Sequence, residues 1–89
     1  MINLVEIAIK AQESMRKEKE YIDGVKNAML WLHSSKYYDG TYLEAIDYIN
    51  RKIAIASLNA INNPMYIGCI ALYSAMIDEL LYLVKQEGK

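Results

Sequence analysis

A long stretch without a charged side chain, from Ile53 to Ile77, constrains the fold of this 89-residue chain more than any other feature. The stretch is long enough to cross a bilayer. Its middle holds the sequence Asn-Asn-Pro at residues 62–64, and a membrane-spanning helix would have to bury these polar groups in hydrocarbon. Two helices of a soluble domain, joined at residues 62–64, satisfy the polar groups better. We therefore expect no membrane span.

Helical periodicity dominates the first third of the chain. Apolar residues recur there at alternating spacings of four and three, which is the pattern of a helix that packs along one seam. Glu18 interrupts the seam within the charged run at 16–20, and Gly24 follows. The pattern predicts one long helix over residues 2–32, or two helices if the chain breaks near residues 18–24. The apolar residues of the seam are Leu4, Ala8, Ala11, Met15, Ile22, Val25, Met29 and Leu32.

Capping signals define two further helices. Thr41 followed by Glu44 forms a capping box, in which each side chain accepts the backbone N–H of the other residue, and this predicts a helix over 42–61. Asn63 is a favourable N-cap and Pro64 suits the first helical position, so a third helix is expected over 64–86. The expected fold is all-α: a single domain over residues 1–89, built as a small antiparallel bundle of three helices, or four if the first one breaks.

The helix expected over 64–86 is apolar on nearly every side down to Ile77. A helix in a small bundle needs an apolar stripe of only ~100°, so two neighbouring helices cannot cover this one. A second copy of the chain is the simplest cover, and we expect a homo-oligomer, with a dimer as the first choice. The expected interface residues are Met65, Ile67, Ile70, Leu72, Tyr73, Met76, Ile77 and Leu80.

The charged and catalytic residue types argue against several classes of function. Ten Lys and Arg against eleven Asp and Glu give no excess of positive charge, so nucleic acid is not an expected partner. His33 is the single histidine and lacks the spacing of a metal site. The single cysteine, Cys69, rules out an intrachain disulfide and fits a reducing compartment. We expect a cytoplasmic protein that is not an enzyme and holds no metal and no cofactor.

The segment 33–42 has the residue types of a ligand site. The start of the following helix offers free N–H groups that hold anions, Lys36 adds positive charge, and tyrosine rings can stack on a base. Asp39 opposes an anion there, and most loops of this kind only connect helices. The candidate ligand-binding residues are His33, Lys36, Tyr37, Tyr38, Thr41 and Tyr42.

These observations lead to two hypotheses. The first is a non-catalytic helical interaction protein, such as an inhibitor, adaptor or regulator, which acts as a homo-oligomer on a protein partner. Phages and mobile elements encode many proteins of this kind. The alternative is an oligomeric binder or sponge of a small anionic, nucleotide-like ligand held by the 33–42 segment. Stabilisation by a nucleotide in a thermal-shift screen would distinguish the alternative from the first hypothesis.

Overall fold

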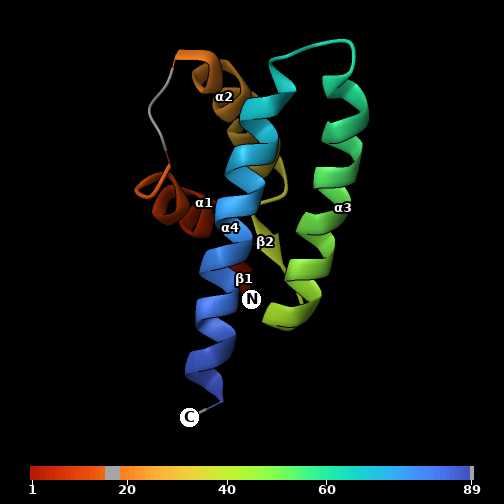
Figure 1. The fold of residues 1–89 in the computed structure, drawn as a ribbon. Coiled ribbons are helices and arrows are strands. Elements are labelled where there is room, and N and C mark those ends of the chain that lie inside the picture. Colours follow the sequence, from red (N-terminus) through yellow and green to blue (C-terminus); the bar gives the residue numbers. More distant parts are fainter. Residues whose placement is uncertain (16–18, 89) are drawn as a thin grey trace.

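Four helices and one very short sheet make up the fold of the residues that the structure describes (Figure 1). The computed structural model describes residues 1–15 and 19–88. The all-α expectation is confirmed, in the form with four helices. The elements in chain order are β1 (Ile2–Asn3), α1 (Leu4–Gln12), α2 (Lys19–Ser34), β2 (Tyr37–Tyr38), α3 (Tyr42–Ala60) and α4 (Tyr66–Glu87).

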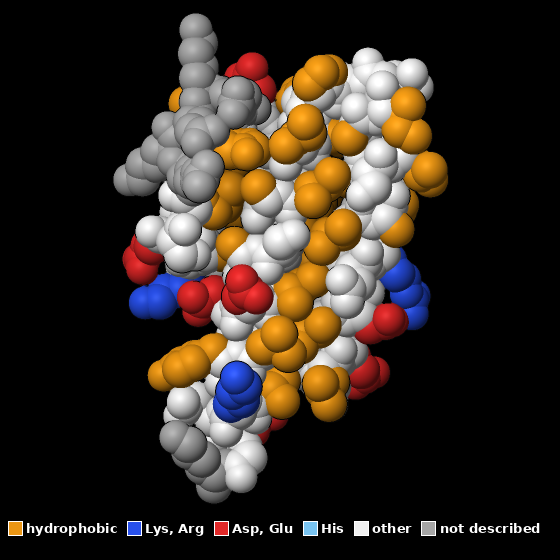
Figure 2. All heavy atoms as spheres, in the orientation of Figure 1, with side chains coloured by type: hydrophobic (Ala, Val, Ile, Leu, Met, Phe, Trp, Pro, Cys, Tyr) orange, Lys and Arg blue, Asp and Glu red, His pale blue; other side chains and the backbone are white. Residues whose placement is uncertain are grey.

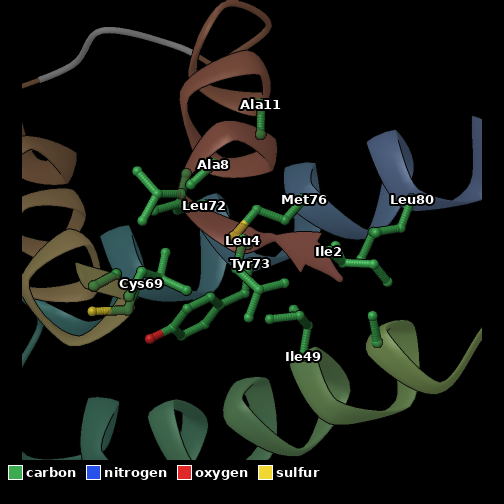
Figure 3. Close-up of a cluster of buried hydrophobic side chains, with 14 of the residues drawn as sticks. Ile2, Leu4, Ala8, Ala11, Ile49, Cys69, Leu72, Tyr73, Met76 and Leu80 are labelled. Atoms are coloured by element: carbon green, nitrogen blue, oxygen red, sulfur yellow. The ribbon is translucent and has the colours of Figure 1, made fainter. Parts of the chain in front are cut away.

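The central element is α4, which packs against α1, α2 and α3. It lies beside α3 along much of its length, with α1 and α2 on its other side (Figure 1). Side chains from all of these helices meet at α4, where Leu4, Ile49 and Leu72 are fully buried (Figure 3). The radius of gyration of 12.6 Å is close to the ~12 Å expected for a compact chain of this length. The other buried hydrophobic residues are Ile2, Val5, Ala8, Ala11, Ala28, Leu32, Ala45, Ala56, Cys69, Tyr73, Met76 and Leu80.

The predicted capping box fixes the start of α3, whereas the predicted N-cap of the next helix, Asn63, is wrong: the N-cap of α4 is Met65, and no side chain caps it. The Glu44 N–H donates to Thr41 Oγ1 at 3.1 Å, and the Thr41 N–H donates to Glu44 Oε1 at 3.0 Å, so the capping box is complete. Asn63 Oδ1 accepts from the Met65 N–H at 3.1 Å. Pro64 lies in the turn before α4 and is not its first residue, because the first bonds after it join residues three apart and the regular helix begins only at Tyr66.

The predicted first helix is two helices, and the break comes earlier than residues 18–24. The helix α1 ends at Gln12, and residues 13–15 form a tighter turn in which each N–H donates to the carbonyl three residues back. The second helix begins at Lys19, so residues 19–24 are helical, while residue 18 lies outside the described residues. The continuous seam hid the break because α1 and α2 both pack against α4, so apolar residues recur on both sides of the break.

Two glycines let α2 and α4 cross at very close range. A Cβ on Gly24 would lie 2.3 Å from the carbonyl oxygen of Met65, and a Cβ on Gly68 would lie 2.6 Å from that of Tyr21. No larger residue fits at either position without a shift of the backbone. The Cys69 thiol also donates to the Gly24 carbonyl at 3.1 Å. Gly24 is therefore a packing residue inside α2 and does not end a helix.

The sheet was not predicted from the sequence. Its strands β1 and β2 are antiparallel, with Ile2 opposite Tyr38 and Asn3 opposite Tyr37. The Leu4 N–H donates to the Lys36 carbonyl at 2.7 Å and extends this pairing. Strands of two residues carry no alternating pattern, so periodicity could not reveal them. The sheet fixes the N-terminus of the chain to the segment between α2 and α3.

Of the helices described, α4 is the one long and apolar enough to cross a membrane by length and composition. In this structure it is the helix that every other helix contacts. Its buried residues include Cys69, Leu72 and Met76, which face the other helices (Figure 3). The same length and composition are found in the core helices of folded domains.

Candidate interaction surfaces

The outward side of α4 carries an apolar strip. Ile67 is 47% exposed and Leu81 is 42% exposed, and the half-buried Ile70 and Ile77 and the exposed Ser74 lie between them. Their spacing of three and four residues places all five on one side of the helix. We call these five residues the α4 strip. Hydrophobic side chains gather over α4 and along its border with α3 (Figure 2). The strip itself contains no charged residue.

The eight interface residues expected from the sequence divide into two groups. Leu72, Tyr73, Met76 and Leu80 are buried within the chain, where a partner cannot reach them in this conformation (Figure 3). The other four are partly or largely exposed, namely Met65, Ile67, Ile70 and Ile77. The sequence could not separate the groups, because α4 is apolar on both its inner and its outer side.

A second apolar surface lies on α3, on the side away from α4. Leu58 is 70% exposed and Ile55 is 53% exposed. Leu58 follows the buried Ala56 by two residues, which turns it by about 200° around the helix and away from the core. We call Ile55 and Leu58 the α3 patch. It lies one turn beyond Arg51, which forms an exposed ion pair with Asp47.

The candidate ligand residues between α2 and α3 are split between exposed and packed positions. His33 is exposed in the last turn of α2. Lys36 and Tyr37 are exposed, with the lysine Nζ 5.3 Å from the centre of the tyrosine ring. Tyr38 packs on Tyr48, with ring centres 5.1 Å apart. Of the remaining two candidates, Thr41 caps α3 and Tyr42 is its half-buried first residue.

The electrostatics at the start of α3 do not favour an anion. The Thr41 hydroxyl occupies the Glu44 N–H, so this donor is not free for a ligand. The hydrogen bonds from the Thr41 backbone and side chain lower the pKa of Glu44, which is therefore ionised at neutral pH. Its carboxylate lies where an anionic ligand would have to bind. Binding of a nucleotide-like ligand by this segment stays a prediction, and this carboxylate opposes it.

An aromatic cluster with one lysine, which the sequence did not reveal, connects α2, α3 and α4. Trp31 of α2 lies with its ring centre 5.8 Å from that of Tyr48 of α3 and 6.5 Å from that of Tyr73 of α4. Lys52 Nζ lies 4.1 Å from the centre of the Trp31 ring. Burial raises the pKa of Tyr73 to about 12. The spacing of Tyr48 and Lys52, one turn apart on α3, was the only signal available from the sequence. These contacts join α2 to α3 and have a structural role.

The described residues include few groups that are suited to catalysis. Burial raises the pKa of the Cys69 thiol, which disfavours the nucleophilic thiolate. Within 1–15 and 19–88, no group of three or more His, Cys, Asp or Glu could hold a metal ion.

An open depression of ≈ 290 Å³ adjoins the α4 strip, and Asp78 is the one titratable carboxylate in its lining. That lining comprises Ser14, Met15, Tyr21, Ala71, Ser74, Ala75 and Asp78.

The α4 strip and the α3 patch are thus the surface features on which we base the proposed function. Both consist of side chains that a single folded chain leaves in contact with water. Large exposed apolar areas on a folded protein mark sites of interaction with other molecules.

Comparisons with protein families, with curated proteins and with solved structures find no match to this chain.

Proposed function

We propose that this protein is a non-catalytic interaction protein that self-associates and binds another protein in the cytoplasm, changing that protein's activity as a small inhibitor, adaptor or regulator does. One observation carries the proposal: the fold leaves two apolar surfaces, the α4 strip and the α3 patch, on different helices and facing different directions. A protein of this size could hide one such surface by dimerisation. The second surface is then available to a different partner.

The composition of both surfaces supports binding to protein. The centres of protein–protein interfaces are depleted in charged side chains, and neither surface contains one. At the α3 patch, Leu58 projects into solvent with Ile55 beside it on the same side of the helix. The ion pair of Arg51 with Asp47 supplies the polar rim that surrounds such contacts.

The α3 patch can be tested by capture of the partner with matched variants. Wild-type protein, Leu58→Glu and Leu30→Glu are expressed with the same affinity tag, and the captured proteins are compared by mass spectrometry. Leu30 of α2 is 71% exposed and Leu58 is 70% exposed, so Leu30→Glu controls for a general loss of apolar surface. Circular dichroism confirms that each variant is folded.

The proposal predicts a protein that wild type and Leu30→Glu capture and that Leu58→Glu loses. It is contradicted if the three samples hold the same proteins, because the α3 patch then binds no partner. It is also contradicted if Leu30→Glu abolishes the capture as fully as Leu58→Glu, since the contact would then not depend on this patch.

A further inference from the structure

We propose that the N-terminal arm, which is β1 with α1 (residues 2–12), exchanges between two copies of the chain. In the dimer, α1 and α2 join into one helix, and each arm packs on α4 of the partner subunit. The inference rests on the self-association in the proposed function and specifies how it occurs. The contact is one that each chain already makes with itself, and it does not involve the α3 patch, so the exchange and the binding of a partner protein can fail separately.

The arm is a separable unit whose contacts a second copy can supply. Its helix α1 packs mainly on α4 and less on α2, and β1 pairs with β2. The side chains on its inner side are buried, so an arm released from this position would expose a row of apolar groups to water. A released arm therefore has to return to a site of the same shape, in its own chain or in another copy. The buried residues of the arm are Ile2, Leu4, Val5, Ala8 and Ala11.

The break between α1 and α2 runs against the local sequence. Residues 4–23 contain no glycine and no proline, and the apolar seam resumes in phase after its interruption at Glu18. Glu13 and Lys17 are four residues apart, in the order that stabilises a helix. In the single chain, the N–H groups of residues 13–15 instead donate to carbonyls three residues back, each at 3.2 Å, as in a tighter and less favourable turn. The sequence therefore favours a continuous helix that the single chain interrupts.

A continuous helix and an arm on its own α4 exclude each other. At 1.5 Å per residue, a straight helix would carry Leu4 ~22 Å beyond Lys19 along the axis of α2. In the single chain, the arm instead turns back so that α1 lies against α4 (Figure 1). Two copies related by a two-fold axis satisfy both requirements, because each straight helix delivers its arm to the site that the other copy has vacated. The exchange is reciprocal and closed, so it predicts a dimer and no larger assembly.

The charges of the joined segment allow two copies to pass each other. Residues 13–20 contain three acidic and three basic residues, so the segment has no net charge and does not repel its counterpart. Ile22 follows this segment and belongs to the apolar seam, yet it is 45% exposed in the single chain. A second helix that passes alongside would cover this side chain.

The exchange is tested first by two substitutions at Ser14, an exposed residue just beyond the end of α1. Alanine is more favourable than glycine within a helix, and the dimer contains two such sites, one in each joined helix. The dimer Kd of Ser14→Gly should therefore be ~30-fold higher than that of Ser14→Ala, as measured by sedimentation equilibrium. A dimer of chains that keep the break would give equal Kd values for the two variants, and equal values overturn the inference.

An insertion gives the second test. Four residues, Gly-Ser-Gly-Ser, inserted after Met15 lengthen the connection in the single chain but interrupt the joined helix. The matched control carries the same insertion after Asn62, in the turn between α3 and α4. Light scattering after size-exclusion chromatography should find dimers for wild type and the control, and a monomer for the insertion after Met15, which circular dichroism should show to be helical.

The outcomes separate this inference from the proposed function. If the insertion after Met15 dimerises as the control does, the exchange is overturned and the self-association stands. If wild type is monomeric at high concentration, both the exchange and the self-association are overturned. Capture of a protein through Leu58 by a monomeric wild type would then leave the partner-binding part of the proposed function standing.

Discussion

At the scale of single residues, Gly24 shows how contact between helices can reverse an intrinsic preference. Glycine within a helix is ordinarily ~1 kcal/mol less favourable than alanine, so replacing it usually stabilises a protein. Here the added Cβ would lie 2.3 Å from the Met65 carbonyl and 2.6 Å from the Gly68 Cα. Because both neighbours are backbone atoms, they cannot move aside as a side chain could.

Gly24→Ala should therefore lower the free energy of unfolding, by about 1–3 kcal/mol, as overpacking in a core does. The measurement is urea denaturation followed by circular dichroism. Gly88→Ala is the control, since a Cβ there meets nothing closer than 3.6 Å. A Gly24→Ala protein as stable as wild type would mean that α2 and α4 do not cross at this point.

The capping box at Thr41 gives a second prediction at this scale. Thr41→Ala should reduce the free energy of unfolding by about 1 kcal/mol, because the Glu44 N–H loses its acceptor. The check is thermal or urea unfolding at neutral pH. No change in stability would mean that the start of α3 is held by other contacts.

The carboxylate of the same box makes this part of the stability depend on pH. The Thr41 hydrogen bonds lower the pKa of Glu44 from 4.5 in the folded protein. A carboxylate with a lowered folded pKa stabilises the fold above its unfolded pKa, and that contribution is lost as the pH falls through the folded value. Wild type should thus be more stable than Glu44→Gln at neutral pH and equally stable in strong acid. If wild type and Glu44→Gln differed by the same free energy of unfolding at neutral pH and in strong acid, the Glu44 carboxylate would not be the source of the difference.

At the scale of elements, α4 has an inner and an outer side that the same substitution should distinguish. Leu72 is completely buried, so Leu72→Asp places an unpaired carboxylate in the core and should abolish folding. Ile70 is half-buried in the α4 strip, so Ile70→Asp should leave a folded chain. Circular dichroism separates the two outcomes. Two unfolded variants, or two folded ones, would be inconsistent with the orientation of α4.

The sequence predicted the elements whose ends carry local chemistry and missed those that depend on distant contacts. The helix α3 was predicted almost to the residue, because Thr41 and Glu44 cap it with bonds to residues nearby in the chain, and the turn at residues 62–64 placed the start of α4 to within two residues. The break before α2 and the pairing of β1 with β2 were not, because the apolar seam runs through the break and two-residue strands have no periodicity. Half of the expected interface proved to be core for a similar reason: composition does not say which side of an apolar helix faces inward.

The contacts of the segment between α2 and α3 also lead to a prediction about ligand binding. Because Glu44 is ionised at the start of α3 and Tyr38 is packed on Tyr48, we expect no nucleotide to raise the melting temperature of the protein. A thermal-shift screen with nucleotides in large excess provides the measurement. A clear rise that Lys36→Glu removes would contradict this expectation and favour the alternative function.

At the scale of the whole molecule, the arrangement of the helices explains the remaining apolar surface. The helix α3 packs along one flank of α4 and α1 and α2 pack along the other, and in the view of Figure 1 none of the described residues crosses in front of α4. Small domains bury a smaller fraction of their surface than large ones, so apolar side chains remain in contact with water. The self-association that we propose would therefore add to the stability of the fold.

Sedimentation equilibrium of the wild-type protein over a wide range of concentration tests this account most directly. The account predicts a mass of about twice the 10.2 kDa of one chain, and dissociation on dilution accompanied by increased binding of a hydrophobic dye. A mass of one chain at every concentration, without dye binding, would contradict it.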